Sequence, residues 1–256
     1  MTTSATIGRT PPLDVEVRHV PVTQSFEWLN RGWDDVKKIG LPGLAHGLLI
    51  ALLGAVLLML GSSHFYFVAA AVTGYLLVGP VMSAGLCELA RRRSAGESIG
   101  FDESLQGLAR NRDGMLHFSF VLALIALLWF ALSAVLLQSV LSTSAPSLAV
   151  VLWGGAMDMS PGQTLGYVVC GGVLAAIVFA MSVVAVPLII DRHASASDAI
   201  RISVRATLSN LPAMLVWAGL IVGLTAIGFA TLLVGMVILA PLLGYATWHA
   251  YRDLIS

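Results

Sequence analysis

Six mainly apolar stretches, each close to the length that a helix needs to cross a bilayer, constrain this chain most. They cover residues 41–61, 65–86, 115–138, 164–190, 211–227 and 229–250. A bilayer core of about 30 Å requires roughly 20 apolar residues in a helix. Only 11% of the residues are charged, against about 25% in soluble domains. We therefore predict an all-α fold, a polytopic transmembrane helix bundle with six spans.

The boundaries inside two long apolar blocks decide the number of spans. The first block is divided at Gly61–His64, and the last is broken only around Ala226–Gly228. Five spans is therefore the alternative count. Six is favoured because about 40 apolar residues exceed the length of a tilted single helix.

The distribution of positive charge predicts the orientation. With six spans, all 14 Lys and Arg residues fall on one side of the membrane, which the positive-inside rule places in the cytoplasm. Residues 1–23 are then a flexible cytoplasmic tail, residues 24–254 form the membrane domain, and both termini are cytoplasmic. The formal net charge is zero, so we expect no nucleic acid as a partner. The apolar composition makes the lipid bilayer the expected partner.

A short amphipathic segment precedes each odd-numbered span, which favours three parallel repeats of a surface helix followed by a two-span hairpin. Spacings of three and four residues place each apolar trio on one helical face. The trios are Leu29, Trp33 and Val36, then Phe101, Leu105 and Leu108, then Ile200, Val204 and Leu208. Ser197 is expected to cap the third segment. The alternative is that any six-span protein with cytoplasmic loops looks somewhat repetitive.

Two further features recur in the three units. Gly40, Asn111 and Asn210 stand where a helix C-cap favours a left-handed Gly or Asn. A proline that should kink the helix lies in each even-numbered span. These are Pro80, Pro187 and Pro241.

Three histidines and one carboxylate form the candidate site. His46, His117 and His249 fall at similar depth near the cytoplasmic edge of their spans, and Glu88 is the repeat equivalent of His249. Three imidazoles and a carboxylate could bind a divalent metal if the helix ends converge. The alternative is that residues with a polar tip prefer the membrane interface.

The span interiors and the known motifs exclude several classes of protein. No Asp, Glu, Lys or Arg occupies the middle third of a span, where ion-coupled carriers usually hold one. Walker loops and well-marked hydrolase and metalloprotease motifs are also absent from the sequence. The Gly162-x-x-x-Gly166 and Gly219-x-x-x-Gly223 pairs offer close helix approach.

Several short sequence segments resemble those of a known family. They include Leu77–Pro80, Glu88–Arg92, Val183–Pro187 and, most specifically, Trp248–Asp253. Together they resemble the bacterial predicted integral membrane proteins grouped as domain of unknown function 2189, over nearly all of residues 26–254. The resemblance implies a multi-pass protein of the bacterial inner membrane with no established activity. Some members are labelled putative cytochrome c oxidase subunit I, but every histidine here lies at an edge or in a loop, unlike haem–copper ligands.

These observations favour a non-enzymatic scaffold or accessory factor of a membrane complex, without a cofactor. Its partners would be the bilayer and another membrane protein or a second copy of the chain. The alternative is a transporter or channel for a small or amphipathic solute. A hydrated cavity lined by Ser and Thr would favour the transporter, whereas a packed bundle with an exposed groove of small residues would favour the scaffold. A metal- or haem-linked enzyme is disfavoured, because it would depend on the histidines alone.

Overall fold

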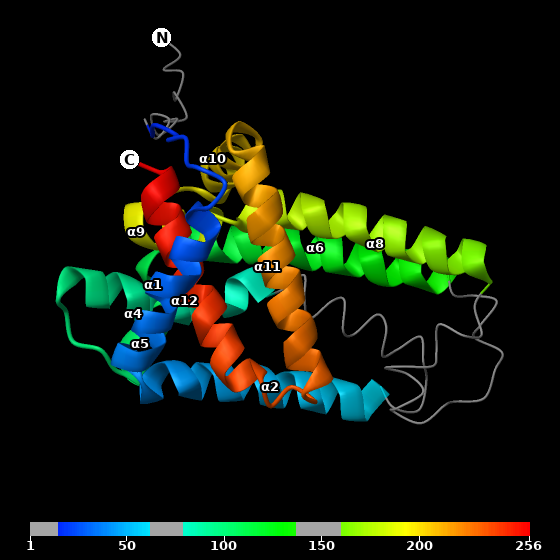
Figure 1. Cartoon of the computed structure of the whole chain (residues 1–256), viewed down its shortest axis with the longest axis horizontal. Coiled ribbons are helices and arrows are strands. Elements are labelled where there is room, and N and C mark those ends of the chain that lie inside the picture. Colours follow the sequence, from blue (N-terminus) through cyan, green and yellow to red (C-terminus); the bar gives the residue numbers. More distant parts are fainter. Residues whose placement is uncertain (1–14, 62–78, 137–159) are drawn as a thin grey trace, which may run out of the picture.

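The computed structural model describes residues 15–61, 79–136 and 160–256, and in these ranges the chain is helical (Figure 1). The predicted all-α class is therefore confirmed. The helices are α1 (Gln24–Ile39), α2 (Leu41–Gly61), α4 (Ala84–Ala95), α5 (Phe101–Arg110), α6 (Arg112–Leu136), α8 (Pro161–Ser182), α9 (Ala185–Arg192), α10 (Ala196–Ser209), α11 (Leu211–Ala230) and α12 (Met236–Leu254).

Three helical segments of the described ranges are long and apolar enough to cross a membrane. They are Arg112–Ser133, Pro161–Arg192 and Leu211–Ala230. A fourth candidate is α1 joined to residues 41–57 of α2, with a bend of 107° between them. Most of the expected span 65–86 lies outside the described residues. The count of six therefore stays a prediction.

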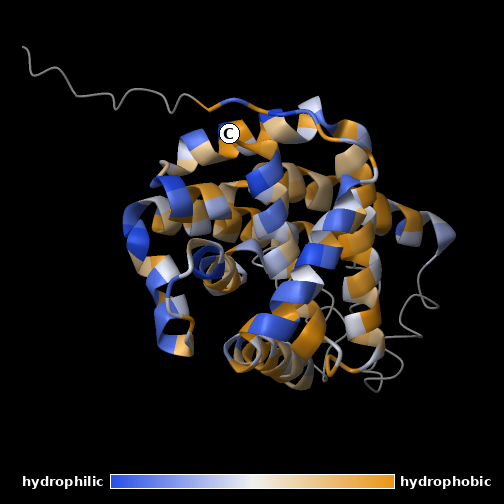
Figure 2. Ribbon diagram, turned by 60° about the vertical axis from the view of Figure 1, so that its left-hand side comes forward, coloured by the Kyte–Doolittle hydropathy of each residue, from blue (hydrophilic) through white to orange (hydrophobic). Residues whose placement is uncertain are grey.

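The long helices do not all share one direction. In Figure 1, α2, α6 and α8 follow the long axis of the molecule, whereas α11 runs across it. Helix α12 packs against both α1 and α2. Hydrophilic colouring in Figure 2 is concentrated around α1, α4 and α5, and hydrophobic colouring extends along α11. The amphipathic helices nevertheless pack directly against apolar ones, as α1 does against α11 and α10 against α8.

The prolines act differently from one another. Pro187 cannot donate a hydrogen bond to the carbonyl of Val183, and its ring crowds that carbonyl. The chain accordingly breaks at residues 183–184, between α8 and α9. The hydroxyl of Ser203 fills the break: it donates to the Ala180 carbonyl (2.8 Å) and accepts from the Val184 amide (3.3 Å). Pro241, by contrast, lies inside α12 without ending it.

The turn between the last two helices lies later than predicted. Helix α11 continues through Gly228 to Ala230, and residues 231–235 form the turn. The Thr231 hydroxyl stabilises this turn by donating to the Gly228 carbonyl (2.9 Å) and accepting from the Gly235 amide (2.9 Å). Gly228 is instead a packing residue, since a Cβ there would lie 2.9 Å from Cγ of Met236. The predicted break at residues 226–228 was therefore wrong.

The helix caps also differ from expectation. Ser195, not Ser197, caps α10, because its hydroxyl accepts from the amide of Asp198 (3.2 Å). Gly40 has a positive φ of 66°, but Asn111 (φ −139°) and Asn210 (φ −125°) are not left-handed. The side chain of Asn210 instead donates to the Ala206 carbonyl of α10 (3.1 Å), whereas that of Asn111 accepts from the Gly114 amide at the start of α6 (3.1 Å).

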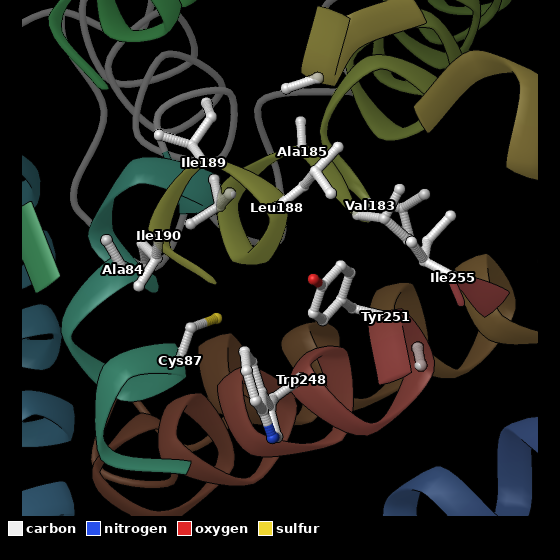
Figure 3. Close-up of a cluster of buried hydrophobic side chains, with 14 of the residues drawn as sticks. Ala84, Cys87, Val183, Ala185, Leu188, Ile189, Ile190, Trp248, Tyr251 and Ile255 are labelled. Carbon is white, nitrogen blue, oxygen red and sulfur yellow. The ribbon is translucent and has the colours of Figure 1, made fainter. Parts of the chain in front are cut away.

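The apolar core lies where α4, α9 and α12 meet. Figure 3 shows Ile189 and Ile190 of α9 near Ala84 and Cys87 of α4, with Tyr251 of α12 on the other side. Residues 185–190 are all buried. This core holds α4 and α12 together, and both helices carry polar residues of the candidate site.

Candidate functional site

Glu88 of α4 is a completely buried carboxylate that three arginines surround. Arg91 binds both oxygens, from Nε to Oε2 (2.8 Å) and from Nη2 to Oε1 (2.9 Å). Arg92 Nε donates to Oε1 (3.0 Å), and Arg110 Nη1 lies 3.9 Å from the same oxygen. A buried carboxylate is tolerated only when it is paired in this way.

Local sequence explains this geometry. Residues three and four apart on a helix share a face, so Arg91 and Arg92 lie beside Glu88. Helix α5 can cover the carboxylate because it presents Gly107, where a Cβ would lie 2.7 Å from the Cβ of Glu88. Gly96 (φ 69°) ends α4, and Glu97 then binds the free side of Arg91 at 2.8 and 2.9 Å. The hydrogen bond from Arg91 lowers the pKa of Glu97 below its ordinary value.

A second buried carboxylate, Asp35 of α1, connects α1 to two other helices. One oxygen contacts the guanidinium of Arg93 on α4, and the other lies 2.8 Å from Nε2 of His249 on α12. Asp35 is 2% exposed. Because these three residues come from distant parts of the sequence, this connection holds three segments of the chain in one arrangement.

The other two histidines of the candidate set have separate environments. His46 is buried, with Nδ1 3.0 Å from the Pro42 carbonyl and Nε2 3.2 Å from the hydroxyl of Ser104. His117 is exposed on α6, and its Nδ1 lies 2.7 Å from the carbonyl of Asp113. Each ring therefore contacts the carbonyl four residues earlier, and His46 also packs against α5, through Ser104 and Phe101.

The structure does not bring His46, His117, His249 and Glu88 together as one set of ligands. Among the described residues, no group of three or more His, Cys, Asp and Glu could hold a metal ion. A shared metal site at these four residues stays a prediction. Sequence reasoning missed Asp35 and the arginines, although the spacing Glu88-x-x-Arg91-Arg92 was a visible signal of an ion pair. The arrangement joins helices, since its carboxylate oxygens are already bound by cations.

Asp253 forms a third polar connection, between α12 and α1. It accepts hydrogen bonds from Gln24 Nε2 (2.8 Å), Trp28 Nε1 (2.9 Å) and the guanidinium of Arg31. Burial alone would raise the pKa of Asp253, but the hydrogen bonds from Arg31, Gln24 and Trp28 hold it below its ordinary value.

Residues 15–20, which we call the N-terminal segment, pack beside this connection. Val17 pairs with Ile255 in an isolated β-bridge, and the amide of Arg18 donates to the Leu254 carbonyl (2.9 Å). The side chain of Asn210 accepts from the Val20 amide (2.9 Å) and donates to the Arg18 carbonyl (3.0 Å). This part of the expected tail is thus fixed to the end of the chain.

Comparisons with known proteins give one match. The model of a family described as predicted integral membrane protein, domain of unknown function 2189, matches residues 67–191. This range contains Glu88 and its arginines but is shorter than the expected 26–254, and it excludes Trp248–Asp253. No curated protein and no solved structure matches the chain.

Proposed function

We propose that this chain, whose residues 67–191 belong to the predicted integral membrane protein family of domain of unknown function 2189, is a non-enzymatic scaffold or accessory factor of a membrane complex. One observation carries the proposal: two Gly-x-x-x-Gly pairs on apolar helices are open, while a third such pair is used inside the chain.

The third pair shows what these glycines do. Gly43 and Gly47 of α2 face α12 so closely that a Cβ would lie 3.1 Å from Cζ of Tyr245 and 2.7 Å from the Val237 carbonyl carbon, respectively. By contrast, nothing within the described residues lies within 4 Å of a Cβ at any glycine of the open pairs. These are Gly162 and Gly166 on α8 and Gly219 and Gly223 on α11.

Small residues let helices approach closely in lipid, where packing replaces the hydrophobic effect as the driving force. On α11 the open glycines lie among exposed apolar residues, including Leu215 (64%) and Val222 (68%). Such a face suits a helix of another membrane protein or a second copy of the chain.

A transporter or channel is the second candidate, and the interruption at residues 183–184 favours it. Discontinuous helices often form the binding sites of transporters. Here the Ser203 hydroxyl already binds Ala180 and Val184 across the interruption. That pairing supports a packed joint more than a solute site.

For the architecture we propose six spans in three parallel repeats, with both termini on the cytoplasmic side of the bacterial inner membrane. Support comes from a cyclic set of contacts: α5 packs on α4, α10 on α8 and α9, and α1 on α12. Each amphipathic helix thereby contacts the second helix of the preceding unit. Cysteine accessibility in intact cells tests the orientation: Ser94→Cys and Ser197→Cys should be protected from an impermeant reagent, and Ser160→Cys should be labelled.

The segments that precede two of these helices support the same repeat. The side-chain amide of Asn111 donates from Nδ2 to the Ala194 carbonyl (2.8 Å), just before α10. Asn210 binds Arg18 and Val20, just before α1. The N-terminal segment would then occupy the place of a linker between the third and first units.

Association in the membrane tests the scaffold. We expect the wild type, extracted in mild detergent, to migrate as a complex larger than one chain, and Gly219→Leu with Gly223→Leu to release the single chain at unchanged thermal stability. Gly172→Leu, at another open glycine of α8, is the control. A wild type that migrates as a single chain would contradict the proposal.

We also propose that the chain works without a metal or a haem. An absorption spectrum from the near ultraviolet to the red, with metal analysis of the purified protein, tests this. A Soret band or stoichiometric metal that is lost on replacing His46, His117 and His249 would contradict it.

A further inference from the structure

Three cations lie where an amphipathic helix meets the next long helix: Lys38 at the end of α1, Arg112 at the start of α6 and Arg205 in the second half of α10. All three are exposed. Among the described residues none of them has a carboxylate within ion-pair distance.

Neighbouring cations of the same helices are paired. Lys37 binds Asp34 (2.6 Å), and Arg201 binds Asp198 (2.9 Å). The protein thus neutralises the cation next to Lys38 and the cation one turn before Arg205, but not these two themselves. Among the described residues, five exposed cations have no carboxylate partner, and three of them lie at these junctions; the other two are Arg18 and Arg252.

An exposed leucine accompanies each of the three cations at the junctions. Leu41 is 80% exposed, Leu116 is 55% exposed and Leu208 is 67% exposed. Leu116 follows Arg112 by four residues and Leu208 follows Arg205 by three, so each pair shares a helical face. Two junctions therefore offer a cation and an apolar side chain on one helical face, and at the third Leu41 follows Lys38 by three residues across the 107° bend between α1 and α2.

The amphipathic helices also expose apolar side chains that could contact lipid. They bury small residues, such as Gly32, Gly107 and Ala206, beside the larger Trp28 and Ile202, and they expose other large apolar residues, such as Phe26 (56%) and Leu105 (48%). Exposed bulky residues on a helix with basic residues suit the boundary between headgroups and acyl chains.

We propose that Lys38, Arg112 and Arg205 bind the phosphates of anionic phospholipids, with Leu41, Leu116 and Leu208 against the acyl chains. Charge complementarity selects anionic lipid, because the phosphate of a zwitterionic lipid is already neutralised by its own ammonium group. The inference rests on the membrane nature of the chain and is independent of the proposed scaffold role.

The test is thermal unfolding of the full chain in mild detergent with added phosphatidylglycerol or phosphatidylcholine. At a phosphatidylglycerol concentration about ten times its Kd, we expect the Tm to rise by about 3–6 °C, and phosphatidylcholine should have no such effect. The variant Lys38→Gln/Arg112→Gln/Arg205→Gln should lose the rise. Its Tm in phosphatidylcholine should equal that of the wild type, because all three side chains are exposed.

A matched control removes the same number of positive charges elsewhere. Lys37→Gln/Arg201→Gln/Arg252→Gln should keep the full rise. The proposal would be overturned if both triple variants lost the rise in Tm equally, or if the junction variant kept it in full. So would the same rise with free glycerol phosphate, which carries the phosphate without acyl chains. Migration of the wild type in the same samples reports on the scaffold separately.

Discussion

The carbonyl group of Val237 occupies the space into which a side chain at Gly47 would project. A Cβ built on Gly47 would lie 2.7 Å from the carbonyl carbon of Val237 and closer still to its oxygen. Pro241, four residues after Val237, has no N–H to donate to this carbonyl. The proline therefore leaves a backbone acceptor on α12 unpaired within its helix, and the glycine lets α2 approach it.

This relationship predicts that Gly47→Ala destabilises the protein. The added methyl would overlap backbone atoms, which cannot move aside like a flexible side chain, so α2 would have to shift away from α12. We expect the free energy of unfolding to fall by about 1–3 kcal/mol. Thermal unfolding in detergent, followed by circular dichroism, should show a lower Tm than for the wild type.

Gly219→Ala is the control, because nothing within the described residues lies within 4 Å of its Cβ. It should leave the Tm unchanged or slightly higher, since Ala favours helix more than Gly does. Equal Tm values for the two variants would show that α2 and α12 are not this close.

Ser203→Ala tests the joint between α8 and α9. In a continuous helix the Val184 amide would donate directly to the Ala180 carbonyl, but here the Ser203 hydroxyl lies between them. Removing the hydroxyl leaves the buried Val184 amide without its acceptor and the half-buried Ala180 carbonyl without this donor, which should lower the free energy of unfolding by about 1–3 kcal/mol. Hydrogen exchange at the Val184 amide should accelerate. Exchange at the wild-type rate would contradict the insertion, and Ser209→Ala, an exposed serine of α10, is the control.

The sequence predicted the all-α class and the positions of α2, α6 and α11, because apolar length is a local property. It could not predict the turn after α11. Gly228 looked like a helix breaker from its neighbours alone, but its role depends on Met236, which folds back against it. The Thr231 side chain, one turn further on, determines where the chain turns.

The candidate site was only partly visible for the same reason. The pair of Glu88 with Arg91 follows from their spacing on one helix. Asp35 and His249 are 214 residues apart, and no local pattern connects them. Similar depth in the membrane, which suggested that the histidines converge, does not specify the direction in which a side chain leaves its helix: His46 faces α5, whereas His117 is exposed.

Glu88→Gln should be among the most destabilising substitutions in the chain. It removes the charge that neutralises Arg91 and Arg92 in a buried position, and breaking such a pair costs about 3–5 kcal/mol. We expect little folded protein by size-exclusion chromatography. Glu97→Gln, at the more exposed end of the same cluster, should fold normally. If both variants fold equally well, the Glu88 cluster does not hold α4 and α5 together.

The environment of Asp253 predicts that the stability of the protein depends on pH. Its pKa is lowered in the folded protein, so its contribution is fully present above the unfolded-state pKa of about 3.9. That contribution declines as the pH falls from there through the folded-state pKa. The Tm of the wild type should exceed that of Asp253→Asn at pH 7, and the difference should shrink toward pH 3. A difference that is constant over this range would exclude the ionised carboxylate as its source.

Asn210→Ala should release the N-terminal segment while α10 and α11 remain folded. The substitution removes the acceptor for the Val20 amide and the donor to the Arg18 carbonyl, both supplied by one side chain. Losing one or two kcal/mol of local stability makes the open state about 5–30 times more populated, so trypsin should cleave after Arg18 faster by that factor. Asn111→Ala removes the equivalent bond to Ala194 and should leave cleavage at Arg18 unchanged. Unaltered cleavage in Asn210→Ala would mean that the pairing of Val17 with Ile255 holds the segment by itself, and that Asn210 has no part in joining the two ends of the chain.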